Sequence, residues 1–247
     1  AAGNTFNIPT IDDTAKTAVA HTEGGAVTDD GGEDATFAQK TLSAYAFDTE
    51  WLRWSAELNA DSILNMESLL GELLGERMGR TANTALTTGS GSSAVEGIVT
   101  GSSLGKTAAA TAAITSDEIL DLIHSVDPAY RASTNTAIMM NDATLAAVRK
   151  LKDGQNNYLW AMGNYQAGIP QSLLGYNVVI NQAMDSLATA KKVMIFGDMS
   201  KYYVRKVGAP SIYIARERFA PDSGILGYLR FDGCVVNSGA IKHMITA

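Results

Sequence analysis

Residues 136–204 read TAIMMNDATLAAVRKLKDGQNNYLWAMGNYQAGIPQSLLGYNVVINQAMDSLATAKKVMIFGDMSKYYV, alternating short apolar runs with turn residues. The run 137–140 stops at Asn141-Asp142, whose short side chains favour caps and turns. A helix is predicted over 143–151, because apolar residues recur there three apart. Strands are predicted over 173–180, buried on both faces at Val178-Val179-Ile180, and over 193–197. None of these residues forms a chemical motif; they are turn residues, core residues and anchoring aromatics.

Five short motifs follow one another in this stretch. They are Asn141-x-x-Thr144-Leu145, Arg149-Lys150-Leu151-Lys152-Asp153, Tyr158-Leu159-Trp160, Leu174-Gly175-Tyr176-x-Val178 and Phe196-Gly197-Asp198-x-Ser200-Lys201-Tyr202-Tyr203. Together, in this order, they resemble the tailed-phage major capsid protein family, which has the Hong Kong 97 type shell fold. The resemblance implies an α+β chain with a long spine helix, an extended E-loop hairpin, a peripheral (P) domain and an axial (A) domain.

The resemblance also implies boundaries for these parts. The E-loop hairpin is expected over residues 1–46 and the axial domain over 101–210. The peripheral domain is expected over 47–100 and 211–247, with the spine helix at about 62–86. Predicted strands at 211–215, 226–231 and 234–236 would return the chain to the spine helix, with Asp232-Gly233 separating the last two.

Composition limits the classes of function. The 247 residues are 46% hydrophobic and only 18% charged, with a net charge of -7. So little charge suggests either that other subunits cover much of the surface or that the chain is a compact, Ala- and Gly-rich monomer. No Lys/Arg block indicates a grip on nucleic acid. The single cysteine, Cys234, excludes an intrachain disulfide and fits a reducing compartment. Neither a transmembrane run nor a signal peptide is visible.

The first 46 residues predict a long hairpin with little apolar surface. A strand at 6–11 and a half-exposed strand at 36–45 flank a polar, Gly-rich loop at 22–34. Its sizeable apolar groups are Phe6, Ile8, Ile11, Phe37 and Leu42. A two-stranded ribbon is marginal in water by itself, and the resemblance implies that it reaches over a neighbouring subunit. For the loop itself, a mobile acidic tip is an equal alternative.

The helix after this hairpin shows one apolar face. Ile63, Met66, Leu70, Leu73, Leu74 and Met78 define it. We expect Leu70 and Leu73 to lie buried beneath the peripheral sheet, and Trp51 and Trp54, just before the helix, to anchor the core. Gly71, Gly75 and Gly79 recur every fourth residue and either allow close approach of a sheet or a bend, or are merely tolerated.

A capping box opens the next helix. Thr115 and Glu118 occupy its two ends, with Ile114 and Ile119 placed as its hydrophobic staple. This box is predicted to start an amphipathic helix that runs through Ile119, Leu122, Ile123 and Val126 and ends before Pro128.

Two glycine-rich matches to catalytic motifs overlap at residues 101–107. Gly101, Gly105, Lys106 and Thr107 resemble a phosphate-binding loop, but that loop needs four residues between its glycines and here there are three. The same stretch matches Gly-x-Ser-x-Gly with Ser103 as a nucleophile and His243 late in the chain, as in a serine hydrolase. Too few strands precede Ser103 to support such an elbow, and a chance match in a Gly/Ser loop is the favoured interpretation.

Metal chemistry finds little support. His21, His124 and His243 are widely spaced and, with one cysteine, make no ligand set. Asp12-Asp13 and Asp29-Asp30 could attract calcium weakly, but neither has the spacing of a six-ligand loop. Arg216-Glu217-Arg218 is interpreted as intersubunit ion pairs or as a solvated face. The sequence thus predicts no catalytic, cofactor-binding or metal-binding residue and no cofactor.

The resemblance implies a major capsid protein that self-assembles into hexamers and pentamers of an icosahedral phage head enclosing double-stranded DNA. Expected partners are copies of itself and a portal, scaffold or decoration protein, without sequence-specific DNA binding and without a membrane. The expected location is the virion, after assembly in the host bacterial cytoplasm. An encapsulin-like or gene-transfer-agent shell is the related alternative, and a serine hydrolase using Ser103 is the alternative from another class.

Overall fold

The computed structural model describes residues 5–11, 16–18, 20–27, 34, 37–62, 65–160 and 172–247. Strands in this part of the chain form three sheets. The two-stranded sheet pairs β1 (Phe6–Ile11) with β2 (Phe37–Leu42). The five-stranded sheet contains β3 (Tyr45–Asp48), β4 (Leu52–Trp54), β10 (Tyr202–Lys206), β11 (Ser211–Ala215) and β12 (Ser223–Val235). The six-stranded sheet contains β5 (Ser103–Thr107), β6 (Thr136–Met140), β7 (Ser172–Leu173), β8 (Tyr176–Ile180), β9 (Lys192–Asp198) and β13 (Ile241–Ile245).

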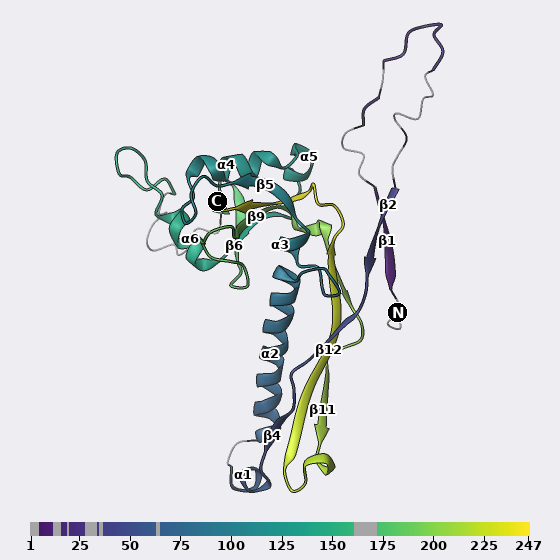
Figure 1. Ribbon diagram of the computed structural model, residues 1–247, viewed down its shortest axis with the longest axis vertical. Helices are drawn as coiled ribbons and strands as arrows, with labels where there is room; N and C mark the ends of the chain where they lie inside the picture. Colours follow the sequence, from purple (N-terminus) through teal and green to yellow (C-terminus); the bar gives the residue numbers. More distant parts are fainter. Residues whose placement is uncertain are drawn as a thin grey trace.

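The helices are α1 (Ala56–Asp61), α2 (Met66–Thr88), α3 (Ile98–Gly101), α4 (Ser116–Ser125), α5 (Pro128–Arg131) and α6 (Asp142–Arg149), with two 3-10 turns at Met199–Lys201 and Glu217–Phe219. Figure 1 shows three parts: the long α2 beside β12, a compact lobe around β6 and β9, and the β1–β2 hairpin, which projects from beside β12.

The spine helix α2 begins later than predicted. The chain first forms α1, capped by Ser55, and Ser62 is already extended, with ψ 133°. Asn65 then starts a new helix, because its side-chain oxygen accepts a hydrogen bond from the backbone N–H of Ser68. This side-chain cap satisfies one of the first helical N–H groups. The predicted start at residue 62 was therefore wrong, and Ile63 lies outside the described residues.

The buried face of α2 also differs from the predicted one. Leu74 and Met78 are buried, whereas Leu70 and Leu73 are only half-buried. Leu74 packs with Trp54 and Ile225 in one apolar cluster. Because α2 packs mainly against the single strand β12, the covered stripe of the helix is narrow, and Leu74 and Met78, four residues apart, are its buried apolar residues.

The three glycines of α2 do not lie against a sheet. A Cβ added at Gly71, Gly75 or Gly79 would meet no atom within 4 Å in the described subunit. The glycine that allows α2 and β12 to approach closely lies in the strand. A Cβ at Gly227 of β12 would lie 2.9 Å from the sulfur of Met78 in α2. A glycine in the strand, and none in the helix, lets the two elements come together.

The strand β12 forms the centre of the five-stranded sheet. It is 13 residues long and pairs antiparallel with β3 and β4 along one edge and with β10 and β11 along the other. The strands predicted at 226–231 and 234–236 are thus one continuous strand, and Asp232-Gly233 does not interrupt it. Of the two predicted tryptophan anchors, Trp54 is buried, while Trp51 is half-buried and packs edge-on to Phe219 at 5.4 Å.

The six-stranded sheet has the order β5-β13-β9-β6-β8-β7 and contains the largest apolar core. Helix α4 contributes Ile119 and Leu122 to this core, α6 contributes Leu145, and β9 contributes Phe196. The apolar run 137–140 lies in β6, and the predicted strand at 193–197 is confirmed as β9. The predicted helix at 143–151 is confirmed as α6, which ends at Arg149 and whose N-cap Asn141 accepts a hydrogen bond from the N–H of Ala143.

The strand predicted at 173–180 is divided into β7 and β8. Leu174 and Gly175 form the turn between them with φ values of 51° and 85°. The expected burial of β8 on both faces was wrong, because Val179 and Ile180 are 37% and 42% exposed. β8 is the fifth strand of six, and its outer neighbour β7 is only two residues long, so little covers it on that side.

The chain crosses between the two large sheets at places that the predicted boundaries did not anticipate. β10 lies within the segment 101–210 but pairs with β12, and β13 lies within 211–247 but sits between β5 and β9. Pairings between strands this distant in sequence are not visible in local patterns. The division of the chain into domains itself stays a prediction.

A core substitution tests the α2–β12 contact. Leu74→Ala is expected to lower the free energy of unfolding of the unassembled subunit by about 2–5 kcal/mol, through lost burial and a residual cavity. Leu69→Ala, on the exposed side of the same helix, serves as the matched control and should change little. Urea unfolding measures both. An equal loss in the two variants would contradict the assigned buried face.

Candidate functional site

Ser103 does not occupy a nucleophile elbow. It lies in β5, and its Oγ donates a hydrogen bond to the backbone oxygen of Ser238 at 2.7 Å. A nucleophile elbow places the serine on a sharp strand-to-helix turn, whereas here α3 ends at Gly101 and a strand begins at Ser103. The same strand occupies the positions of the supposed phosphate loop, since Gly105, Lys106 and Thr107 all belong to β5.

The structure instead brings the neighbouring Ser102 against His243. The Oγ of Ser102 lies 2.9 Å from Nδ1 of His243 and donates to the backbone oxygen of Val99 at 2.8 Å. Both side chains are buried, at 7% and 6% exposure. Sequence reasoning missed Ser102, because only the parallel pairing of β13 with β5 brings these two residues together.

The environment of His243 keeps its imidazole neutral. Burial, followed by the nearby positive charge of Lys192, lowers the pKa of His243 to about 4. Lys192, on β9, has its own pKa lowered by burial and donates to the oxygen of Val99 at 3.1 Å. Because both side chains are covered and Ser102 Oγ also contacts the backbone oxygen of Val99, this group ties α3, β9 and β13 together rather than presenting a nucleophile.

The other candidate ligands are dispersed. His21 is exposed, and His124, in the last turn of α4, lies 3.0 Å from a guanidinium nitrogen of Arg131. Cys234 is buried, and burial, with Glu96 nearby, raises the pKa of its thiol to about 11. No cluster of three or more metal-binding side chains occurs among the described residues. The pairs Asp12-Asp13 and Asp29-Asp30 lie outside them.

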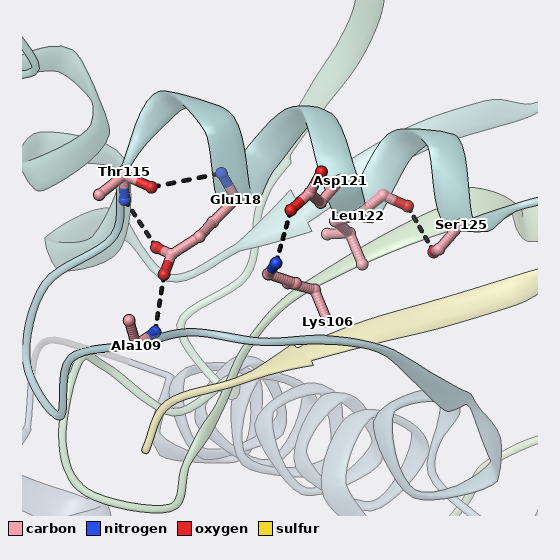
Figure 2. Close-up of polar contacts among 7 residues, drawn as sticks. All are labelled: Lys106, Ala109, Thr115, Glu118, Asp121, Leu122 and Ser125. Carbon is pink, nitrogen blue, oxygen red and sulfur yellow. Dashed lines mark hydrogen bonds and ion pairs between the residues drawn. The ribbon is translucent and has the colours of Figure 1, made fainter.

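The predicted capping box at Thr115 is confirmed, and Figure 2 shows that it does more than start α4. One oxygen of Glu118 accepts from the N–H of Thr115, and the other accepts from the N–H of Ala109. Burial acts to raise the pKa of Glu118, but these backbone hydrogen bonds outweigh it and hold the pKa below its usual range. The carboxylate thereby fixes the end of β5 to the start of α4.

A second contact in Figure 2 joins the same two elements. Lys106 of β5 makes an ion pair with Asp121 of α4 at 2.5 Å, and this hydrogen bond raises the pKa of Lys106. The polar groups of this region thus link secondary structure elements to one another and do not converge on a cavity.

Large apolar side chains are instead exposed on extended elements. Phe6, Ile11 and Phe37 of the hairpin are 54%, 50% and 74% exposed, and the edge strand β11 exposes Ile212, Tyr213 and Ile214. Exposed apolar groups gathered on such surfaces mark contacts with other proteins. The described residues thus combine a long helix, a projecting hairpin and two large sheets, and groups of exposed apolar side chains lie on the hairpin and on β11.

The family model that matches the chain is the phage capsid family, over residues 1–245. The chain belongs to the phage capsid family. It is accordingly a major capsid protein, a structural protein with a capsid fold. No curated protein matches it in sequence. In the described residues, no helix is long and apolar enough to cross a bilayer.

Solved capsid structures share the fold at low sequence identity. The capsid of a native GTA (gene-transfer-agent) particle has a TM-score of 0.86 and 24% identity, covering 98% of this chain and 85% of its own. The structure from Microbacterium phage Oxtober96 has a TM-score of 0.76 and 17% identity, covering 100% and 87%. That from Gordonia phage Cozz has a TM-score of 0.70 and 13% identity, covering 100% and 82%.

The buried histidine predicts a pH dependence of subunit stability. His243 has a pKa lowered from 6.5 to about 4, so between these values the unfolded chain binds a proton that the folded chain does not. Stability is therefore complete above pH 6.5 and falls as the pH drops toward 4, by up to roughly 3 kcal/mol.

Urea unfolding across this pH range provides the measurement. His243→Gln should flatten the dependence, whereas His124→Gln, at an exposed site, should leave it unchanged. Carboxylates with lowered pKa values, such as Glu118, begin to lose their contribution as the pH falls below their unfolded value of about 4.5, so the variants are compared above that pH. An unaltered slope in His243→Gln would show that His243 does not titrate as described.

Proposed function

We propose that this capsid protein self-assembles into hexamers and pentamers of an icosahedral head that encloses double-stranded DNA. The observation that carries the proposal is the hairpin, whose apolar side chains are mostly exposed to solvent in the single subunit. Family membership and the shared capsid fold support it.

The energetics of the hairpin favour contacts with neighbours. Fully burying one large apolar side chain contributes about 1.5–3 kcal/mol, yet Phe6, Ile11 and Phe37 remain at least half exposed. Ordering each residue of the backbone costs about 1–2 kcal/mol. The hairpin's own contacts are too few to offset this cost, so a well-ordered hairpin needs surface from another subunit. Obligate interfaces of this kind bury roughly 2,000 Å² or more in total.

The proposal also assigns domain roles to the remaining parts. The five-stranded sheet with α2 corresponds to the peripheral domain, and the six-stranded sheet with α4 and α6 to the axial domain. Residues 1–46 correspond to the E-loop. Because β13 pairs within the six-stranded sheet and β10 within the five-stranded sheet, we assign β13 to the axial part and β10 to the peripheral part.

The charge of the chain suits a container for DNA. Its net charge is -7, so packed DNA would be enclosed without tight phosphate binding. The proposed location is the virion, with assembly in the bacterial cytoplasm and a portal, scaffold or decoration protein as further partners. A gene-transfer-agent or encapsulin-like shell is the second candidate, favoured by the similarity to the GTA particle capsid. Nuclease digestion of purified shells is the test: DNA that survives digestion identifies a shell that contains DNA, and its absence identifies an empty or protein-filled shell.

The proposal includes the absence of serine catalysis. A fluorophosphonate probe should label neither Ser103, whose hydroxyl donates to a backbone oxygen, nor Ser102, which is buried. Mass spectrometry after incubation with the probe gives the readout, with a known serine hydrolase as the positive control. Stoichiometric labelling that Ser103→Ala or Ser102→Ala abolishes would contradict a purely structural role.

Removing the hairpin tests its role in assembly. Replacing residues 10–40 with a short Gly/Ser linker should leave a folded subunit that forms no stable shells, as seen by negative-stain microscopy. Phe37→Ser should weaken assembly without lowering subunit stability, because Phe37 is 74% exposed. Ala38→Ser, on the neighbouring exposed position, is the matched control.

Hydrogen exchange gives an independent readout of the same idea. Residues 10–40 should exchange fast in free capsomers and slowly in mature shells. Equally slow exchange in the free subunit would mean that the hairpin is held by its own chain, and the argument for its role would fail.

A further inference from the structure

The hairpin joins the rest of the described chain at a short connection. β2 ends at Leu42 and β3 begins at Tyr45, so residues 43–44 are the covalent link between the hairpin and the five-stranded sheet. β1 is attached through its antiparallel ladder with β2, from Phe6 opposite Leu42 to Ile11 opposite Phe37. The direction in which the hairpin projects (Figure 1) therefore depends on how residues 42–43 are held.

Two charged side chains hold this connection through its backbone. Asp232 of β12 accepts a hydrogen bond from the N–H of Ser43 at 2.5 Å. Arg205 of β10 donates through Nη1 to the backbone oxygens of Leu42 at 2.8 Å and of Ser43 at 3.2 Å. One donor and two acceptors of the connection are thus paired with side chains instead of with another strand.

The two side chains are placed for this task by the sheet. Arg205 and Asp232 are directly opposite each other in the β10–β12 ladder, so their side chains leave the same face of the sheet. Asp232 is only 4% exposed and also accepts from the N–H of Gly233 at 2.8 Å. A buried carboxylate that accepts two backbone hydrogen bonds has its position closely fixed, since an unpaired buried charge is costly.

The other contacts at this end of the hairpin are weaker or less directional. Leu42 is buried, which anchors the connection without fixing an angle. Lys40 and Glu96 approach to 3.9 Å, with both side chains partly exposed. An ion pair of this length at the surface adds little and is screened by salt.

We propose that Arg205 and Asp232 form a hinge clamp that sets the angle between the hairpin and the five-stranded sheet. The clamp acts on the backbone of residues 42–43, so it positions the hairpin without depending on the sequence of its strands. The consequence for shells rests on the proposed function: subunits with a free angle would present their hairpins in many directions and close shells poorly.

Distances between spin labels on the unassembled subunit test the clamp directly. Labels at Ala38→Cys on β2 and Arg80→Cys on α2, both exposed positions, are introduced with Cys234→Ala and measured by pulsed dipolar spectroscopy. Arg205→Ala should widen the distance distribution about twofold or more, as expected when a hinge is released. Lys206→Ala, which removes the same charge from the next residue of the same strand, should leave the width unchanged.

Hydrogen exchange at Ser43 provides a second measurement in the same protein. Asp232→Ala removes the acceptor of its N–H, and exchange there should accelerate about ten- to a hundredfold, the loss of one hydrogen bond to a charged group. Asp232→Asn keeps an oxygen at this site and should give a smaller change. If Arg205→Ala unfolds the β10–β12 ladder, Asp232→Ala with the spin labels decides in its place, because it removes the acceptor of the Ser43 N–H.

Unchanged distance distributions in Arg205→Ala, or in Asp232→Ala where Arg205→Ala unfolds, would overturn the clamp. So would equal widening in Lys206→Ala, because the effect would then follow charge and not these contacts. Assembly of the same variants is examined separately. If the parent protein forms no shells, the proposed function fails, while the distance measurements still decide the clamp.

Discussion

The packing of β12 against α2 is the contact on which the rest of the structure depends. A single 13-residue strand pairs with four others, two on each edge, and its Ile225 meets Leu74 and Trp54 beneath the sheet. The strands it gathers come from residues 45–54 and from residues 202–215, at opposite ends of the chain. Without this strand, the connection to the hairpin and the crossing to the six-stranded sheet would have no common support.

The two large sheets differ in how much apolar surface they bury within the subunit. The six-stranded sheet has a conventional covered core, in which Ile138, Met140 and Phe196 are fully buried. The elongated part has a narrow core beneath one helix, and β11 and the hairpin leave large apolar side chains in solvent. Burial contributes in proportion to the apolar area removed from water, so much of the stabilisation available to the elongated part is realised only in contact with other subunits. This is the physical basis for treating assembly as part of the folding of such a chain.

Polar and ionisable side chains in this protein serve connections between elements. Glu118 joins the end of β5 to α4, Asp232 and Arg205 hold the base of the hairpin, and Ser102 with His243 lies between α3 and β13. Each satisfies backbone groups at places where strands and helices end, where the regular hydrogen-bond pattern leaves them unpaired. Ser102 and His243 therefore connect secondary structure elements, and because both side chains are buried, they are not accessible to a substrate.

The sequence alone determined the local elements whose signals are local. The cap at Asn141, the capping box of Thr115 and Glu118, the buried strand at 193–197 and the membership suggested by five ordered motifs were all predictable, because each depends on residues close together in the chain. It also determined that residues 101–107 lack the spacing of a phosphate loop. Only the tertiary structure decided that Leu74 and not Leu70 is fully buried and that Val179 and Ile180 of β8 are exposed. It also decided that β10 belongs to the five-stranded sheet and β13 to the six-stranded sheet. It also revealed Ser102 beside His243 and the hinge clamp on residues 42–43. These depend on which strands pair across segments far longer than one helix or strand and on which face a neighbouring strand covers, and hydrophobic periodicity carries no information about either.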